Sequence, residues 1–234
     1  MHKSIDPAIL YFGTPVVLVS STNPDDSPNL APMSSAWWLG RSCMLGFGTR
    51  SQTPANIQRT GDCVLNLPSV GEVAAVNRLA RTTGSDPVPQ WKAENGYRHV
   101  RDKFGAAELT PLPSDCVTPP RVAECPVHLE AVLEAVHPLA VRDPERRGRL
   151  VALEVRVIRV HVDEAIRLTG YDDRIDPERW HPLIMSFQHF FGLGGIVHPS
   201  TLARIPESAY RPHPPVSAAA TVPAPPLSLG AIDS

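Results

Sequence analysis

Residues 43–67 read CMLGFGTRSQTPANIQRTGDCVLNL, and this stretch decides how we interpret the rest of the chain. Its two ends, residues 43–48 and 63–67, are short and rich in apolar side chains, which predicts two buried strands. Between them, Thr53 is a favourable N-cap, the proline after it a favourable first helical residue, and Gly61 a favourable stop. The stretch therefore predicts a two-turn helix between two strands.

Strand and turn signals continue toward the N-terminus. Residues 15–20 form a valine-rich apolar run that is typical of a buried strand, and residues 29–38 are a second strand candidate. Residues 23–28 between them, NPDDSP, are typical of a turn. The order strand, turn, strand, turn, strand predicts an antiparallel meander rather than a β–α–β unit.

Three further segments predict short helices. Ser69 and Glu72 have the spacing of a capping box, in which the serine side chain accepts from a helical N–H and the glutamate accepts from the serine N–H. Residues 97–104 predict a short helix inside a loop-rich region. Residues 176–180 predict another, because Asp-Pro at its start suits a helix N-terminus.

The second half of the chain holds the longer strand candidates. Residues 149–162 alternate apolar and polar side chains, which predicts a long, half-buried strand. Residues 127–136 fit both strand alternation and helical spacing, so periodicity leaves their type open. About six strands and three or four short helices, without regular alternation, predict a mainly β fold with some α: a β-barrel or folded sheet with short helices packed outside.

Length and composition restrict the class of protein. The 234 residues are 42% hydrophobic, which is enough for a full core, and a net charge of −2 excludes the basic surface that nucleic acid or an anionic membrane would require. No segment predicts a signal peptide or a membrane span, so we expect a cytoplasmic protein. Residues 206–234 contain seven prolines and few charges. We expect a disordered tail there, after one domain over residues 1–205.

The cysteines predict neither a metal centre nor a redox pair. No two of them form a CxxC motif, which argues against a zinc site and against a dithiol. We expect all of them to be small buried apolar side chains in a reducing compartment. The four are Cys43, Cys63, Cys116 and Cys125.

The turn before the predicted helix has the donors that a phosphate requires. The first N–H groups of a helix lack partners inside the helix and carry partial positive charge. The polar side chains around this helix start are Thr49, Arg50, Ser51, Gln52, Thr53 and Asn56. They outnumber what a cap needs, but composition alone also fits ordinary capping of a surface helix.

Residues 29–38, NLAPMSSAWW, are the second candidate binding segment. Serines beside small residues and proline would leave backbone donors and acceptors free along an open strand edge. Such an edge suits the imide-like rim of a flat heteroaromatic ring. The alternative is a core strand in which Trp37 and Trp38 pack inward.

Together these segments resemble the flavin reductase-like proteins of the FMN-binding split-barrel superfamily. The motifs that carry the resemblance are YFGTPVVLV at 11–19, NLAPMSS at 29–35, SQTPAN at 51–56 and GDCVLNLP at 61–68. Weaker similarity continues through HVD at 161–163 and PLIM at 182–185. The resemblance covers roughly residues 10–205 and matches the flavoredoxin-like branch best, because the Gly-Asp-His segment of the short flavin reductases is missing.

The resemblance implies an FMN-binding split β-barrel with short peripheral helices that works as a homodimer. By the family pattern, the phosphate of FMN lies at the turn that holds Arg50, Ser51, Gln52, Thr53 and Asn56, beside Thr49. The isoalloxazine ring lies along Met33, Ser34, Ser35, Ala36 and Trp37.

The resemblance also implies that NADH or NADPH reduces the flavin, often to supply a separate monooxygenase. Because the flavin carries out the hydride and electron transfer, the protein's task is to hold and tune it. Two other functions stay open. One is a flavin-binding electron carrier, and the other is an FMN or haem enzyme that acts directly on a small organic substrate.

Three late histidines have two open interpretations. They are eight and nine residues apart in a loop-rich region, which fits metal or haem ligands as well as ordinary surface or interface residues. The three are His181, His189 and His198.

Overall fold

The computed structural model describes residues 1–198 and residue 200, and Met1–Ile196 form a compact unit. The expected tail at residues 206–234, and the expected domain end at residue 205, lie outside the described residues. Within the part that is described, no helix is both long enough and apolar enough to cross a membrane.

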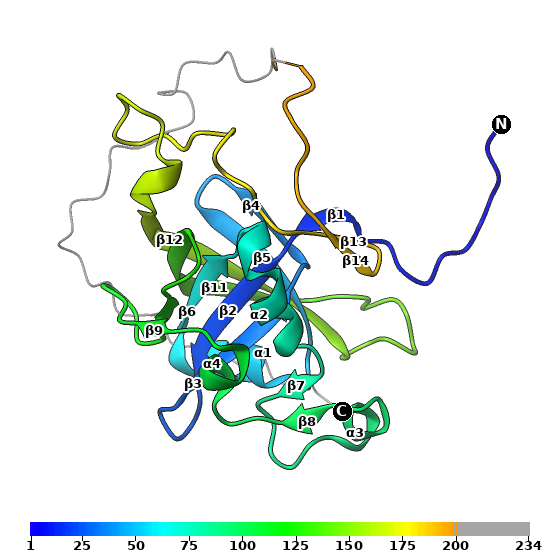
Figure 1. Cartoon of the computed structure of the whole chain (residues 1–234). Helices are drawn as coiled ribbons and strands as arrows, with labels where there is room; N and C mark the ends of the chain where they lie inside the picture. Colours follow the sequence, from blue (N-terminus) through cyan, green and yellow to red (C-terminus); the bar gives the residue numbers. More distant parts are fainter. Residues whose placement is uncertain (199, 201–234) are drawn as a thin grey trace. The chain divides into compact units, whose positions relative to one another are not determined.

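The core of the fold is a seven-stranded antiparallel sheet in the order β3-β2-β6-β11-β12-β5-β4 (Figure 1). Its strands are β2 (Val17–Thr22), β3 (Pro28–Met33), β4 (Ala36–Leu39), β5 (Ser42–Gly48), β6 (Asp62–Leu67), β11 (Val127–Pro138) and β12 (Leu150–Val162).

The sheet closes on itself at Ser34 and Ser35. These two residues are the whole connection between β3 and β4, which are the two opposite edges of the sheet. Three Cα steps reach about 11 Å at most, so the edges must come together and the sheet curls into a barrel. The barrel prediction is confirmed. The predicted simple meander is wrong, because β3 and β4 are not paired and the expected strand over residues 29–38 is two strands.

Smaller elements surround the barrel, and all of them are short. The remaining strands are β1 (Phe12–Pro15), β7 (Thr82–Thr83), β8 (Arg98–His99), β9 (Pro111–Leu112), β10 (Arg121–Val122), β13 (Ile184–Ser186) and β14 (His189–Phe191). The helices are α1 (Gln52–Thr60), η1 (Val70–Glu72), α2 (Val73–Arg78), α3 (Gln90–Glu94), α4 (Lys103–Ala107) and η2 (Glu164–Ile166). Figure 1 shows α1, α2 and α4 outside the strands, as the sequence predicts.

Strand β2 and the residue before it are buried on both faces, which explains the unbroken valine-rich run. Val17 and Val19 face one apolar cluster, inside the barrel. Val16 and Leu18 face a second cluster, which contains residues of α2 and α4. A strand with one face in solvent would have alternating polar residues. The unbroken apolar sequence of β2 is therefore consistent with helices covering its outer face.

Helix α1 ends where the sequence predicts and begins two residues earlier. Gly61 adopts φ 81°, and its N–H donates to the Ile57 carbonyl at 2.8 Å, which closes the helix. The N-cap is Ser51, so the predicted N-cap at Thr53 is wrong. The physical reason is tertiary: the Thr53 side chain is buried and hydrogen-bonds to β3 instead of capping its own helix.

The capping box is confirmed. The Ser69 N–H donates to Glu72 Oε2 at 2.7 Å, and the Gly71 N–H donates to Ser69 Oγ at 3.1 Å. The box opens the 3-10 turn η1, which continues into α2. Residues 127–136, whose type the sequence leaves open, belong to strand β11, because β6 and β12 pair with it on both sides.

Two predicted helices are wrong. In residues 97–104, Arg98–His99 pair with Thr82–Thr83 as a short parallel ladder, and the helix α4 starts only at Lys103, after the capping side chain of Asp102. Residues 176–180 form a turn, in which Asp176 Oδ1 accepts from the Glu178 N–H at 2.9 Å. This side-chain bond competes with a helix over so short a segment.

Candidate functional site

The turn between β5 and α1 is fixed to the neighbouring hairpin. The Thr49 N–H donates to the Arg149 carbonyl at 3.0 Å, and Thr49 Oγ1 donates to the Gly148 carbonyl at 2.8 Å. The Ser51 N–H donates back to the Gly48 carbonyl at 3.0 Å, which completes the turn. Thr49 therefore holds the turn in place, and its hydroxyl proton is engaged in the hydrogen bond to Gly148.

Arg50 and Ser51 form the exposed side of this turn. Arg50 is exposed, and its guanidinium makes no hydrogen bond or ion pair with any residue that the structure describes. The Ser51 hydroxyl makes no capping hydrogen bond. The start of α1 thus presents a permanent cation with several donor hydrogens, a hydroxyl and the first helical N–H groups, which together suit an anion.

Beneath the turn lies a polar network that includes Gln52 and Asn56, two residues that the resemblance places at the phosphate. Asn56 is fully buried and donates to Ser21 Oγ at 3.2 Å and to Asn23 Oδ1 at 2.9 Å. Its own oxygen accepts from Gln52 Nε2 at 2.8 Å. Asn56 therefore has its hydrogen-bonding groups engaged within the protein, and it ties α1 to β2 and to the turn after β2.

Thr53 belongs to the same network. Asn29 Nδ2 donates to Thr53 Oγ1 at 3.1 Å and to Ser21 Oγ at 3.1 Å. All of these groups are buried, so the network holds the first turn of α1 against β2 and β3. The sequence analysis did not single out Ser21 and Asn23, because their contact with α1 joins residues more than 30 positions apart.

The second candidate segment lies beside the first. The Gly46 N–H donates to the Ser35 carbonyl at 2.8 Å, so the β3–β4 connection lies along the last residues of β5. A Cβ at Gly46 would lie 3.1 Å from the Ser35 Cβ, so the two backbones approach closely there. Ser35 Oγ also lies 3.0 Å from Tyr11 Oη. The tertiary structure thus places residues 35–37 along β5, the strand that leads into the turn at residues 49–51.

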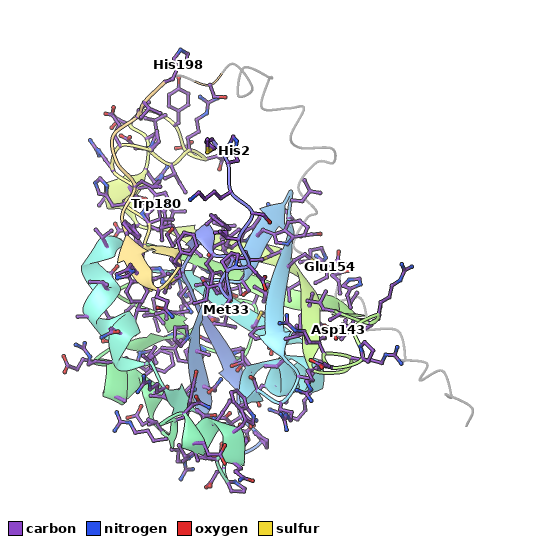
Figure 2. The ribbon with its side chains drawn as sticks, turned by 90° about the vertical axis from the view of Figure 1, so that its right-hand side faces the viewer. His2, Met33, Asp143, Glu154, Trp180 and His198 are labelled. Atoms are coloured by element: carbon purple, nitrogen blue, oxygen red, sulfur yellow. The ribbon has the colours of Figure 1, made fainter. Side chains whose placement is uncertain are left out.

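The side chains of this segment point in different directions. Met33 is partly buried and packs against the barrel core, and Figure 2 labels it near the centre of the view. Ala36 is buried, Trp38 packs against the core, and Trp37 is 56% exposed. Ser34 is half-buried. The alternative in which both tryptophans pack inward is therefore wrong for Trp37, because β4 is an edge strand whose side chains alternate.

The late histidines do not gather into a ligand set within the described residues. His181, His189 and His198 are all exposed, and no group of three metal-binding side chains contains any of them.

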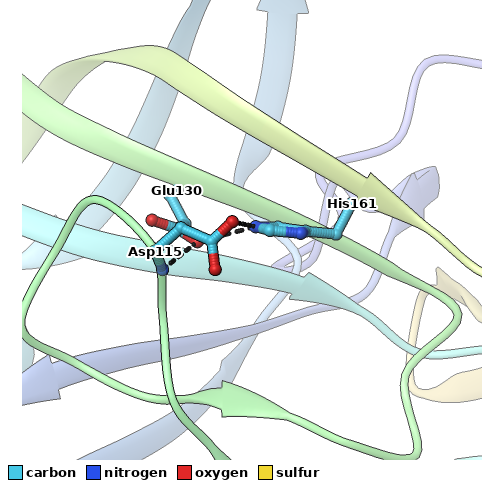
Figure 3. A group of neighbouring side chains, drawn as sticks. All are labelled: Asp115, Glu130 and His161. Carbon is cyan, nitrogen blue, oxygen red and sulfur yellow. Dashed lines mark hydrogen bonds and ion pairs between the residues drawn. The ribbon is translucent and has the colours of Figure 1, made fainter. Parts of the chain in front are cut away.

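Asp115, Glu130 and His161 do lie together (Figure 3), with ligand atoms within 4.8 Å of one another. Glu130 is fully buried, and one of its oxygens, Oε1, lies 2.7 Å from His161 Nε2. The same oxygen accepts from the Asp115 N–H at 2.9 Å, and Oε2 accepts from the Cys116 N–H at 2.6 Å. These bonds fasten the loop that carries Asp115 to the sheet.

Positive charge already surrounds this cluster. Arg121 lies 3.8 Å from Asp115, and the pKa of Arg159 is raised by the adjacent Cys116 and, less strongly, by the carboxylates of Asp115 and Glu130. Burial alone would raise the pKa of Glu130, but its hydrogen bonds lower it below the ordinary value. We interpret the cluster as a structural hydrogen-bonded cluster rather than a cation site.

The cysteine prediction is correct for three residues and wrong for Cys116, which is exposed on the loop that Glu130 anchors. Burial raises the pKa of Cys43 to about 12 and raises the pKa values of Cys63 and Cys125 further above the ordinary range. Only a thiolate reacts quickly with alkylating agents.

We therefore expect iodoacetamide to label Cys116 alone in the native protein and all four cysteines in urea. Peptide mass spectrometry measures the sites. Labelling of Cys43 or Cys63 without urea would contradict the buried positions that the structure gives them.

Comparisons with known proteins identify the family of this chain. The sequence matches the flavin reductase like domain over residues 9–194. It is 38% identical over 192 residues to the uncharacterized protein YdfE of Bacillus subtilis (strain 168), covering 82% of this chain and 89% of that protein.

Two solved structures show the same fold. The flavoredoxin of Desulfovibrio vulgaris (Miyazaki F) superposes with a TM-score of 0.69 at 22% identity, covering 87% of this chain and 99% of that one. Nitrilotriacetate monooxygenase component B from Bacillus cereus gives a TM-score of 0.67 at 24% identity, covering 85% and 99%. With its split-barrel fold and the family match over most of its length, the chain belongs to the flavin reductase-like domain family.

Proposed function

We propose that this protein binds FMN and uses it as an NAD(P)H-dependent oxidoreductase of the flavin reductase type. The observation that carries the proposal is the turn at the start of α1. It presents an arginine and a serine hydroxyl that have no partner among the described residues, together with helical N–H groups, and a buried network fixes it to β2 and β3. This arrangement fits the phosphate of a mononucleotide.

In this proposal Arg50, Ser51 and the N–H groups of Gln52 and Thr53 contact the phosphate. Thr49 and Asn56, together with the Thr53 side chain, hold these donors in position. The isoalloxazine ring lies along residues 33–37, which run beside the end of β5. When bound, FMN supplies the hydride and electron transfer, and the protein supplies orientation and a fixed electrostatic environment.

Exposed apolar side chains support a homodimer. Phe12 is 70% exposed, Trp37 56% and Leu39 75%, and all three lie on β1 or the edge strand β4. Large apolar side chains that gather in one exposed region are typical of an interface. Because Trp37 belongs to the proposed ring-binding segment, the partner subunit would lie next to the flavin.

A partner monooxygenase and a cytoplasmic location complete the proposal. One structural relative is a monooxygenase component, which supports delivery of reduced flavin to a separate oxygenase. The cysteines are free thiols, three of them buried, which suits a reducing compartment.

An absorption spectrum before and after anaerobic NADH or NADPH tests the proposed function. We expect a yellow protein, or one that becomes yellow with added FMN, whose blue absorption is lost rapidly with the reductant. Rapid loss only with a chemical reductant favours a flavin-binding electron carrier or an enzyme with its own organic substrate. A Soret band, or no flavin binding at micromolar FMN, would overturn the proposal.

Replacing the unpartnered guanidinium gives a sharper test. Arg50→Ala should weaken FMN binding by about 1.5–3 kcal/mol, because a hydrogen bond to a charged group contributes that much. Flavin fluorescence titration measures the dissociation constant. Arg179→Ala is the matched control, since Arg179 is exposed and pairs with Asp176 at 3.4 Å, and it should bind FMN like the wild type. Equal affinity in both variants would remove Arg50 from the site.

A further inference from the structure

The loop between β11 and β12, residues 139–149, carries a group of arginines that the proposed flavin site does not use. Its sequence is LAVRDPERRGR, and its cations are Arg142, Arg146, Arg147 and Arg149. Four arginines and two acidic residues give this arginine loop a formal charge of +2. Because the whole chain carries −2, the other residues carry −4, so the loop has the opposite charge to the rest of the chain.

Hydrogen bonds within the arginine loop fix its backbone. The Asp143 carbonyl accepts from the N–H groups of Arg146 and Arg147 at 3.2 Å and 2.8 Å, and Asp143 Oδ1 accepts from the Glu145 N–H at 3.0 Å. Gly148 adopts φ 73°, a conformation that glycine takes at no steric cost. Figure 1 shows the loop extending away from the barrel, and Asp143 is labelled on it in Figure 2. A structured turn therefore presents these arginines at the surface.

The guanidinium groups of the loop have donors to spare. All four arginines are exposed, and Arg142 and Arg149 make no side-chain hydrogen bond or ion pair with any residue that the structure describes. Arg146 Nε lies 3.7 Å from Asp143 Oδ2, a surface contact that contributes little. Arg147 Nε donates to the Val141 carbonyl at 3.0 Å. Since a guanidinium has five N–H donors, most of them can still bind an acceptor from outside the chain.

Exposed apolar side chains accompany the arginines. Leu139 is 40% exposed and Val141 49%, and Val136, near the end of β11, is 41% exposed. Arginine beside apolar side chains is typical of protein–protein interfaces. Nucleic acid binds chiefly through neutralisation of its phosphates, and here Asp143 and Glu145 interrupt the positive charge. The composition of the loop therefore favours a protein with acidic and apolar side chains.

The arginine loop adjoins the turn at the start of α1. The Thr49 N–H donates to the Arg149 carbonyl at 3.0 Å, and Thr49 Oγ1 donates to the Gly148 carbonyl at 2.8 Å. Gly48, the last residue of β5, pairs with Leu150, the first residue of β12. A protein that docks on the loop would therefore lie beside the turn to which we assign the phosphate of FMN.

We propose that residues 139–149 form a docking surface for an acidic, partly apolar face of the protein that accepts the reduced flavin. The proposal rests on the proposed function for the identity of this acceptor, whereas the acidic face follows from the charge of the loop. Complementary charge speeds the encounter of two proteins and orients them. The planar guanidinium of arginine also binds a carboxylate through two parallel hydrogen bonds, which favours one docked geometry.

The test measures binding of the full chain to two fluorescent peptides of equal charge, one of Glu-Glu-Leu repeats and one of glutamate alone. Fluorescence anisotropy at low salt gives the dissociation constants. The test variant combines Arg142→Ala with Arg146→Ala, and the matched control combines Arg98→Ala with Arg101→Ala, two exposed arginines at and after β8. All of these side chains are exposed, so both variants should melt close to the wild type.

We expect the wild type and the control to bind the Glu-Glu-Leu peptide, and the test variant to bind it about tenfold more weakly or worse. The wild type should prefer the Glu-Glu-Leu peptide over the glutamate peptide, and Val141→Ser should reduce that preference. Binding should weaken when the salt concentration is raised to about 0.15 M, because exposed charges are screened. FMN affinity, measured by fluorescence titration, should be the same in the test variant and the wild type.

Four results would overturn the docking surface. One is equal peptide affinity in the test variant and the wild type. Another is tighter binding of oligouridylate or of phosphatidylserine vesicles than of the peptide through the same arginines. A change in oligomeric state of the test variant on size-exclusion chromatography would assign the loop to a second copy of the chain. A loss of FMN affinity in that variant would assign its arginines to the flavin.

Failure of the docking surface is distinguishable from failure of the proposed function. If FMN binds and NADH or NADPH reduces it, but the arginines make no difference to peptide binding, the docking surface is overturned and the proposed function stands. If peptide binding depends on the arginines yet no flavin binds, the acidic docking surface stands and the flavin proposal fails.

Discussion

Glu130→Gln should lower the free energy of unfolding by about 2–4 kcal/mol, because the fully buried carboxylate accepts three hydrogen bonds and the amide cannot accept all of them. The wild-type carboxylate accepts two backbone N–H groups and lies 2.7 Å from His161. A glutamine has one acceptor oxygen, so its amide nitrogen would face a donor. Urea denaturation followed by circular dichroism measures the change.

A matched control lies four residues along the same strand. Glu134 is partly exposed and pairs with Arg156, and Glu134→Gln should cost at most about 1 kcal/mol, the usual contribution of a surface ion pair. Similar losses in the two variants would contradict the anchoring role that we assign to Glu130.

The pH dependence follows from the lowered pKa of Glu130. A carboxyl group whose pKa is lower in the folded state contributes stability above its unfolded pKa. That contribution is lost as the pH falls through the folded pKa, below the ordinary value of 4.5. The stability difference between wild type and Glu130→Gln should therefore shrink as the pH falls below about 4.5.

Asn56→Ala should destabilise the protein by about 2–4 kcal/mol and also weaken FMN binding, because one buried and two part-buried hydrogen bonds are lost. The partners are Ser21, Asn23 and Gln52. The loss of FMN affinity should be indirect, through a loosened start of α1. Denaturation and flavin titration measure the two effects.

The control for Asn56 is another amide on the same helix. Gln58 is exposed and hydrogen-bonds only to the Pro54 carbonyl, one turn earlier. Gln58→Ala should change stability by less than about 0.5 kcal/mol and leave FMN affinity unchanged. If Asn56→Ala weakens FMN binding without any loss of stability, Asn56 contacts the ligand directly instead of supporting the turn.

Part of the candidate site was predictable from the sequence because it rests on local chemistry. Arg50 and Ser51 lie next to the start of a helix, and the donors of a helix start are fixed by its first few residues. Thr53 and Asn56 occur in the same motif, but their role depended on which way their side chains turn. Both turn inward, toward β2 and β3, which no local pattern in α1 specifies.

The sequence by itself determined the features that depend on neighbours along the chain: the stop at Gly61, the capping box of Ser69 and Glu72, and the alternation of β12. Only the tertiary structure decided that β3 and β4 close a barrel, that residues 127–136 form a strand, and that the side chains of Thr53 and Asn56 turn toward β3 and β2. The physical reason is how far apart along the sequence the interacting groups lie. Local hydrogen bonds and periodicity act over a few residues, whereas strand pairing depends on segments that can lie far apart in the chain, such as Val132 of β11 and Asp62 of β6.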